Sequence, residues 1–302
     1  MFRSLPGSRP TRWCVAGLIA ITTTLVSAQG PPAFDSNKAW EHVRQQVAIG
    51  PRPSGSPANA RTRQYITAQL AALGIKTVEQ PFDGATPIGP IKMVNLIGTI
   101  PGRSTDRIIL ASHFDTKLYR EVRFVGASDG ASSTAALLEL ARGLKARKDL
   151  PFTIELLFFD GEEAVGDWSA TDSTYGSRHY VEAARKSGSL KSIRALVLLD
   201  MIGDRNLTIR RDPNSTRWLT DIIWATAHKL GHRQFLDEEM AIEDDHLPFL
   251  KAGVPAVDII DLEYAAWHTP QDTMDAIAAR SLQIVGDVVV AALPQIEARL
   301  LK

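Results

Sequence analysis

The chain has almost no cysteine, since Cys14 is the single example among 302 residues. An intrachain disulfide is therefore excluded, and so is a metal site built from several thiolates. An excess of charge is also absent, because 34 lysines and arginines balance 34 aspartates and glutamates. Such a balance does not favour nucleic acid or an anionic membrane as a partner. With 44% hydrophobic residues, the chain can instead bury a sizeable core.

The N-terminus lacks a hydrophobic run long enough to span a membrane, which needs ~20 residues. Three arginines precede an apolar segment at 15–26, and the small residues Ser27 and Ala28 follow it. This order is typical of a secretory signal peptide, and the shortness of the run disfavours the alternative of a retained anchor. We predict a signal peptide over residues 1–28 and a mature catalytic domain over 29–302. The mature domain would be periplasmic or extracellular, with no membrane partner.

Short apolar runs alternate with segments of helical periodicity along the chain. Strands are expected at 77–82, 93–100, 107–112, 153–159, 193–199 and 254–260, and helices at 36–48, 58–73, 130–144, 177–187, 214–230 and 277–293. Continuous apolar strands between helices are typical of parallel strands that are covered on both faces. We therefore predict a single α/β domain with a mixed, mostly parallel central sheet and helices on both faces. The segments 204–212 and 234–243 match no pattern.

Carboxylates and imidazoles follow the predicted central strands or lie in the loops after them. In open α/β sheets, ligands bind at the carboxyl ends of the strands. Histidine and carboxylate ligands without cysteine suit a catalytic zinc, and manganese or another divalent ion accepts the same ligands. Singly, each residue is better explained as a turn, a cap or a solvated side chain; together they predict one metal site. The residues are His113, Asp115, Asp129, Glu162, Glu163, Asp200 and His268.

Glu162 and Glu163 are the most informative pair in this set. They follow the apolar run 154–159 and would lie at the end of a buried strand. Two adjacent carboxylates are costly to bury without a cation, because like charges disfavour joint ionisation. Neighbouring side chains point in different directions, so one carboxylate can bind a metal while the other faces the substrate. The alternative is an exposed pair with no metal.

The order of these residues resembles the zinc-dependent aminopeptidase superfamily and, within it, the glutaminyl-peptide cyclotransferases. The resemblance runs from about residue 50 to the C-terminus, and its most similar stretches are 158–164 (FFDGEEA), 175–179 (YGSRH), 244–250 (DDHLPFL) and 267–269 (WHT). The resemblance implies the phosphorylase/hydrolase-like α/β fold of that superfamily. It also implies zinc ligands and catalytic carboxylates, which are Asp129, Glu163 and His268 for zinc and Glu162, Asp200 and Asp244 for catalysis.

This family implies an acyltransferase that converts the N-terminal glutamine of peptides to pyroglutamate and releases ammonia, with one zinc ion. Trp168 and Trp267 favour that activity, because large apolar walls with an indole N–H can bind an amide and exclude water. Asp244 adds a carboxylate that can bind the leaving amide. Trp218 and Trp224, in contrast, have helical spacing and are interpreted as core residues. We expect a monomer.

Two other hypotheses stay open at this point. The first is an aminopeptidase with two metal ions, for which His113 and Asp200 would complete the ligand set or hydrogen-bond to it. All five positions of that arrangement are present, so ligand identity alone does not exclude it. The second is a non-catalytic binding ectodomain on the same fold, which the complete ligand set and the intact Glu162 disfavour.

Overall fold

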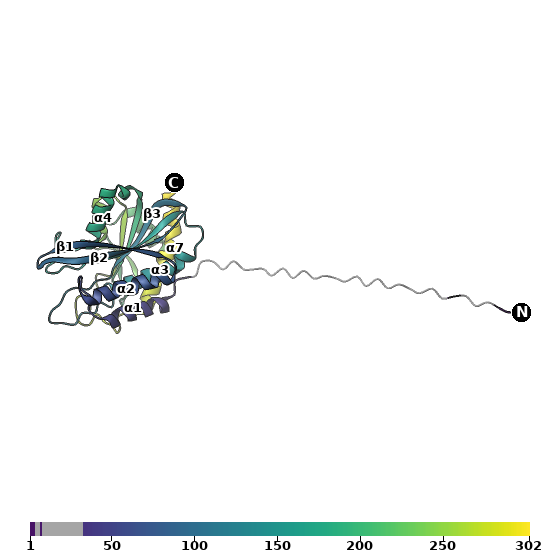
Figure 1. The fold of residues 1–302 in the computed structure, drawn as a ribbon, viewed down its shortest axis with the longest axis horizontal. Coiled ribbons are helices and arrows are strands. Elements are labelled where there is room, and N and C mark those ends of the chain that lie inside the picture. Colours follow the sequence, from purple (N-terminus) through teal and green to yellow (C-terminus); the bar gives the residue numbers. More distant parts are fainter. Residues whose placement is uncertain (4–6, 8–32) are drawn as a thin grey trace. The chain divides into compact units, whose positions relative to one another are not determined.

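The computed structural model describes residues 1–3, 7 and 33–302 of the chain. The apolar segment and the cleavage site of the predicted signal peptide lie outside the described residues. Over 33–302, helices and strands alternate, and Figure 1 shows strands crossing the middle of this part of the chain with helices on either side of them.

A six-stranded mixed sheet forms the centre of the fold. In spatial order its strands are β1 (Lys76–Thr86), β2 (Gly89–Ile100), β4 (Phe152–Phe159), β3 (Ser104–His113), β5 (Ile193–Asp200) and β8 (Ala256–Ile260). The β1–β2 hairpin is antiparallel and joins β4 in the antiparallel sense, whereas β4, β3, β5 and β8 are parallel to one another. The predicted mixed, mostly parallel sheet is therefore confirmed.

Helices cover both faces of this sheet, as predicted. One face carries α1 (Ser36–Ile49), α2 (Pro57–Ala72), α3 (Ala131–Ala146), α5 (Arg217–Lys229) and α7 (Ala279–Leu300), and the other carries α4 (Tyr175–Ser187), the 3-10 turn η1 (Ser189–Ser192) and α6 (His246–Lys251). In β5, Val197 and Leu199 pack into the first core while Leu196 and Leu198 pack into the second. A strand buried on both faces needs such a continuous apolar run.

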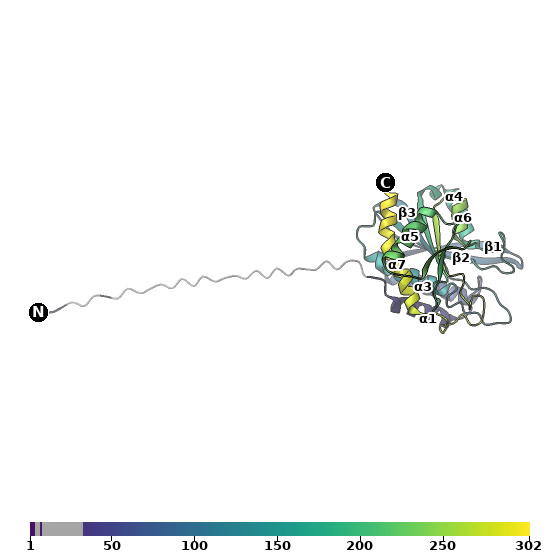
Figure 2. The ribbon, with the colours of Figure 1, turned by 180° about the vertical axis from the view of Figure 1, so that it is seen from behind.

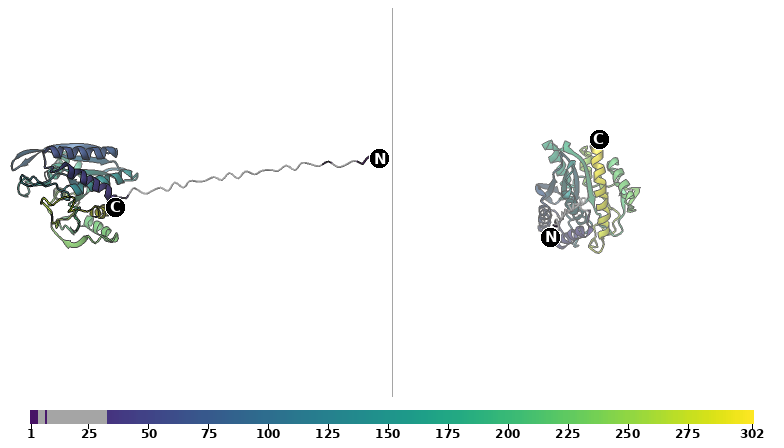
Figure 3. Two further views of the ribbon diagram at one scale, coloured as in Figure 1. Left: turned by 90° about the horizontal axis from the view of Figure 1, so that it is seen from below. Right: turned by 90° about the vertical axis from the view of Figure 1, so that its right-hand side faces the viewer.

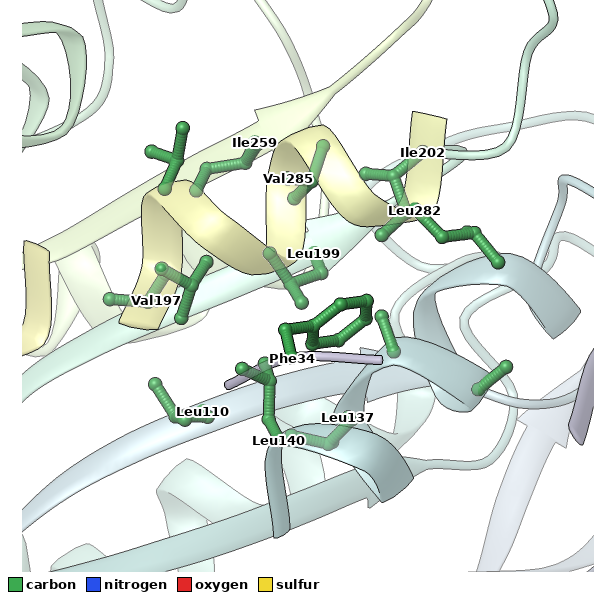
Figure 4. Packing of buried hydrophobic residues seen from close by; sticks show 14 of the residues in the cluster. Phe34, Leu110, Leu137, Leu140, Val197, Leu199, Ile202, Ile259, Leu282 and Val285 are labelled. Carbon is green, nitrogen blue, oxygen red and sulfur yellow. The ribbon is translucent and has the colours of Figure 1, made fainter. Parts of the chain in front are cut away.

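The larger core lies between the sheet and α7. Figure 4 shows Val197 and Leu199 beside Val285 of α7, with Phe34 nearby. Phe34 packs directly on Gly286, where an added Cβ would lie 2.3 Å from its ring. Figure 2 and the right-hand view in Figure 3 show α7, in yellow, running to the C-terminus. Among the described helices, α7 alone is long and apolar enough to cross a membrane, but most of it is buried here and it serves as a core helix.

The first two helices begin at polar caps that satisfy free backbone N–H groups. The Asp35 carboxylate accepts from the backbone N–H groups of Asn37 and Lys38 at the start of α1. At the start of α2, Ser56 accepts from Asn59, and Pro57 occupies the first turn, where it costs no hydrogen bond. The Gly50–Ser56 loop between these helices contacts the edge of the sheet where the predicted site lies.

The predicted elements are all present. Their boundaries differ by up to four residues, except that α7 runs seven residues beyond its predicted end at 293. Four short elements were not predicted, and one of them is η1. The strands β6 (Ile209–Arg211) and β7 (Phe235–Glu239) pair in a separate two-stranded sheet, and they fall in the two segments that matched no pattern. The helix α6 has six residues and contains Pro248. Elements this short carry too few residues for a periodicity to be recognised.

Candidate active site

The polar residues that follow the central strands meet at one edge of the sheet. His113 ends β3, Asp160 follows β4 and Asp200 ends β5, and these parallel strands are neighbours. A cavity of about 200 Å³ opens beside this edge. Of the residues to which the sequence assigned a role in the site, all but His113 and Asp115 line this cavity, namely Asp129, Glu162, Glu163, Trp168, Asp200, Asp244, Trp267 and His268.

A tight turn after β4 leads into the two glutamates. Gly161 has φ +73°, a conformation that favours glycine, and the turn is held by Asp115, which accepts from the backbone N–H groups of Glu162 (3.2 Å) and Glu163 (3.4 Å). The Glu163 carboxylate reaches His268, with 3.2 Å between Oε2 and Nε2, whereas Glu162 Oε2 lies 3.8 Å from His113 Nδ1. The pair is buried and its members face different partners, as the sequence predicted.

Asp129, Glu163 and His268 form a group that could hold a metal ion, because their ligand atoms all lie within 4.8 Å of one another. His268 Nε2 is 3.4 Å from Asp129 Oδ2, and that buried oxygen has no hydrogen-bond partner among the described residues. A second group that meets the same criterion consists of His113, Asp129 and Asp200. The two groups share Asp129, and only the first consists entirely of residues that line the cavity.

The loop that carries Asp129 is fixed by a residue that the sequence did not single out. Asp272 is fully buried, and its carboxylate accepts from the backbone N–H groups of Ser128 (2.7 Å) and Asp129 (3.1 Å). The Tyr264 hydroxyl donates to the same carboxylate at 2.7 Å. These contacts fix the backbone on which the Asp129 side chain is mounted. No local sequence signal marks Asp272, since its backbone partners lie 143 and 144 residues away.

Three aromatic rings surround His268. The Trp267 ring lies at 30° to the imidazole with 4.5 Å between ring centroids, and the edges of Phe124 (5.9 Å) and Tyr119 (6.3 Å) meet it. His268 itself has φ +55°, a strained value for a residue other than glycine. Strain of this kind is retained where the surrounding contacts fix the side chain, which is common at functional sites.

His113 lies behind the cavity, in contact with several carboxylates. Its Nε2 is 3.0 Å from Asp200 Oδ1 and 3.3 Å from Asp129 Oδ1, and its Nδ1 is 3.5 Å from Asp115 Oδ1. Burial opposes protonation of the imidazole, but the carboxylates of Asp200 and Glu162 outweigh it and raise the pKa of His113 well above its ordinary value.

Burial also dominates the titration of the carboxyl groups that line the cavity. It raises the pKa of Glu162 and of Asp244 well above the ordinary range, and it raises the pKa of Glu163 to about 7, with the Asp129 carboxylate adding to the effect. The pKa of Asp200 is raised for the same reason, although His113 opposes the shift. A cation bound among so many buried carboxyl groups would stabilise their ionised forms.

The two tryptophans stand at the mouth of the cavity. Trp168 is 38% exposed and Trp267 is 42% exposed, so neither is an ordinary core residue. The Trp168 indole N–H donates to Glu243, which lines the same cavity. Trp224, in contrast, is fully buried and Trp218 packs against the main core, which confirms the sequence-based interpretation of that pair.

Comparison with known proteins gives consistent matches. The model of peptidase family M28 matches residues 95–293. A glutaminyl-peptide cyclotransferase-like protein of Mus musculus is 34% identical over 270 residues, which cover 80% of this chain and 70% of the mouse protein. The crystal structure of an Acidobacteriales bacterium glutaminyl cyclase is 40% identical with a TM-score of 0.86, and the match covers 92% of this chain and 100% of that one.

A further structural match bears on the alternative activity. The crystal structure of a leucine aminopeptidase precursor from Bacteroides thetaiotaomicron is 29% identical with a TM-score of 0.80, and the match covers 87% of this chain and 98% of that one. The fold and the sequence are thus similar both to proteins described as cyclases and to one described as a peptidase. The choice between the two activities depends on the residues of the cavity.

Proposed function

The chain belongs to peptidase family M28 and, within it, to the glutaminyl-peptide cyclotransferases, and from that premise we propose that it cyclises N-terminal glutamine. Its substrates are peptides or proteins that begin with glutamine, and its products are the pyroglutamyl chain and ammonia. One observation carries the proposal. A carboxylate suited to proton transfer, Glu162, shares a single cavity with the candidate metal residues and with two mouth tryptophans, Trp168 and Trp267.

Asp129, Glu163 and His268 are proposed to hold one zinc ion. Their donor atoms are nitrogen and oxygen, and three such ligands facing an open cavity are typical of a catalytic zinc site. The unpartnered Oδ2 of Asp129 supports this assignment, because a cation would satisfy it. Zinc bound there would supply Lewis-acid polarisation of the γ-carbonyl group of the substrate glutamine.

Glu162 is proposed to carry the proton. The α-amine nitrogen of the substrate forms a bond to its own γ-carbon, and the bond from that carbon to the amide nitrogen breaks. Glu162 accepts the proton that the amine loses and returns it to the departing nitrogen, so that ammonia leaves and the carboxylate is regenerated. Burial raises the pKa of Glu162 well above its ordinary value, which suits a group that both accepts and donates a proton near neutral pH.

Asp244, Asp200 and the two tryptophans are proposed to orient the substrate. Asp244 Oδ2 is buried and has no hydrogen-bond partner among the described residues, so it can accept from the substrate amine or amide. Asp200 holds His113 at 3.0 Å and thereby orders the inner wall of the cavity. The indole walls exclude water, which would otherwise compete with the amine, and they favour the folded substrate geometry.

An aminopeptidase with two metal ions is the second candidate function. The group of His113, Asp129 and Asp200 favours it, because its ligand atoms are close enough to hold a second ion. Against it, His113 is only 1% exposed, and its Nε2 already makes a 3.0 Å hydrogen bond to Asp200. We therefore propose one metal ion and cyclisation.

A peptide that begins with glutamine distinguishes the two functions. Incubated with the purified protein, it should lose the mass of one ammonia and then remain stable. Successive shortening from the N-terminus would instead identify an aminopeptidase, and no change with either glutamine-initiated or other peptides would favour a binding protein. Elemental analysis of the same sample should give one zinc per chain.

Export and monomeric state are proposed as well. The order of arginines, apolar segment and small residues over 1–28 supports cleavage of a signal peptide after Ala28, which leaves residues 29–302 in the periplasm or outside the cell. N-terminal analysis of protein recovered from the producing cells tests the cleavage site. Light scattering of the purified chain tests the monomer.

A further inference from the structure

Arg52 is a fully buried cation in the loop between α1 and α2. Its side chain is 0% exposed, and among the described residues its guanidinium hydrogen-bonds to backbone carbonyls and to no carboxylate. Burial lowers the pKa of Arg52 to about 10, with nearby carboxylates opposing the shift, so the guanidinium stays charged at neutral pH. Charged side chains are rarely buried without a partner, so this arginine requires an explanation.

The guanidinium donates to backbone carbonyls in two separate loops. Nε donates to Phe114 O (2.7 Å), which lies directly after β3. Nη1 donates to Val125 O (2.5 Å), and Nη2 donates to Gly126 O (2.9 Å) and to Asp129 O (3.4 Å). One planar group therefore ties the loop that carries Asp129 to the end of the strand that carries His113. Lysine could not bond to all of these carbonyls, because it lacks the guanidinium fork.

Two glycines leave room for the Arg52 side chain. Gly126 has φ +53° and Gly130 has φ +81°, and a Cβ on either glycine would lie within 3.5 Å of Arg52 Nη2. Arg52 is itself held in place, because its backbone N–H donates to Thr116 Oγ1 at 3.0 Å and its carbonyl accepts from Asn59 Nδ2 at 3.4 Å. Gly126 O also accepts from the backbone N–H of Ala131 at 3.3 Å, whereas loss of the guanidinium would remove a charged donor from Phe114 O and Val125 O.

We propose that Arg52 is a positioning residue for the metal centre, which it serves by holding the Asp129 loop against the end of β3. The inference rests on the proposed zinc site. Two effects of Arg52 on zinc would have opposite signs. Its charge repels a divalent cation, so charge alone predicts tighter zinc binding when the charge is removed. Its hydrogen bonds hold the Asp129 loop in position before zinc binds, so loss of the guanidinium group should weaken zinc binding.

The test compares Arg52→Lys and Arg52→Met with the wild-type chain, using chelator competition for the zinc dissociation constant and thermal unfolding of the metal-free protein. Both substitutions should weaken zinc binding about tenfold to a hundredfold, the range for removing a residue that supports a ligand. The Lys variant should regain the wild-type kcat at saturating zinc. Zinc binding that is unchanged or tighter in both variants would overturn the proposal.

A matched control separates positioning from general stability. Arg107 is near the start of the same strand β3 and pairs with Glu155 at 2.7 Å, far from the loop of Asp129 in sequence. Arg107→Lys should lower the unfolding temperature and leave the zinc dissociation constant unchanged; an equal loss of zinc affinity in this control would refute the proposal. If Arg52→Met does not fold, Thr116→Val provides the second variant, and it should weaken zinc binding in the same direction.

The zinc-binding test of Arg52 does not depend on which reaction the protein catalyses. A wild-type chain that binds no zinc would refute the metal site and this inference together. Zinc binding without cyclase activity would refute only the proposed reaction and would leave the role of Arg52 to be decided by the dissociation constants.

Discussion

A 3.3 Å hydrogen bond joins the indole nitrogen of Trp168 to the carboxylate of Glu243, and it links two cavity-lining segments that are 75 residues apart in the chain. Both side chains are exposed, yet both line the cavity. The bond therefore fixes the position of the large, apolar Trp168 ring at the mouth of the cavity, where a substrate peptide would enter.

Loss of this bond should affect substrate binding more than chemistry. Glu243→Ala frees the indole, and we expect KM to rise about twofold to tenfold, the effect of one modest hydrogen bond, with little change in kcat. Glu243→Gln keeps an acceptor oxygen and should have nearly the wild-type KM. Steady-state kinetics with a glutamine-initiated peptide checks both values. An equal rise of KM in the Ala and Gln variants would show that the charge of Glu243, and not its contact with the indole, affects substrate binding.

Glu162 and Glu163 should respond differently to the same substitution. Glu162→Gln should lower kcat about 10²- to 10⁴-fold, because a proton carrier is lost, while the zinc content stays that of the wild type. Glu163→Gln should lose both zinc and activity, because it removes a ligand oxygen from the group with Asp129 and His268. Zinc analysis beside kinetics distinguishes the two. A Glu162→Gln protein that retains turnover would remove Glu162 from the mechanism.

Much of the site could be predicted because its residues stand at the ends of predictable strands. His113, Asp200 and the pair Glu162-Glu163 each follow a continuous apolar run, and such runs are local features of the sequence. Parallel strands bring their carboxyl ends to one edge, so the convergence followed from the sheet without any knowledge of distances. The boundaries of the central strands needed only small correction for the same reason.

The supporting residues could not be predicted, because their partners are backbone groups of distant segments. Asp272 binds the N–H groups at 128 and 129, and Arg52 binds carbonyls at 114, 125, 126 and 129. In the sequence each is an isolated charged residue in a loop, with no pattern to separate it from a solvated one. Their function depends on the tertiary path of the chain, which the periodicity of individual elements does not encode.

The buried Asp258 carboxyl group should make the free energy of unfolding depend on pH. It lies in β8, it is 1% exposed, and neither of its carboxyl oxygens has a hydrogen-bond partner among the described residues. Burial raises its pKa well above that of an ordinary aspartate, and the Asp244 carboxyl group adds to the effect. The folded chain then holds a proton that the unfolded chain releases near pH 4, so stability is lost as pH rises above about 4.

Asparagine cannot ionise, so Asp258→Asn should remove this loss. The free energy of unfolding should exceed that of the wild type, and the difference should be larger at pH 8 than at pH 5. Urea unfolding of the metal-free proteins at the two pH values measures it, with the exposed Glu239→Gln as a control that should show no such trend. A difference that does not vary with pH would show that Asp258 is ionised in the folded state.

The buried His42 should make the free energy of unfolding depend on pH with the opposite sign. Its Nδ1 lies 2.7 Å from the Tyr65 hydroxyl, between α1 and α2, and burial lowers its pKa from 6.5 to about 4. Below pH 6.5 the unfolded chain takes up a proton that the folded chain resists, so stability falls as pH falls towards 4. The loss approaches about 3 kcal/mol below that point. His42→Gln should remove it, which urea unfolding at pH 7 and pH 4.5 measures; the same acid loss in both proteins would assign it to other groups.

Cleavage at the predicted site would make the mature protein a substrate of the proposed reaction. Removal of residues 1–28 leaves Gln29 as the new N-terminus, which is the residue that the proposed reaction consumes. Wild-type protein recovered after export should therefore carry pyroglutamate at position 29 and resist Edman degradation. Glu162→Gln protein prepared in parallel should yield glutamine at the first cycle, apart from slow spontaneous cyclisation. Glutamine at the first cycle of the active wild-type protein would show that the N-terminus cannot reach the cavity of another molecule, while a different first residue would refute cleavage after Ala28.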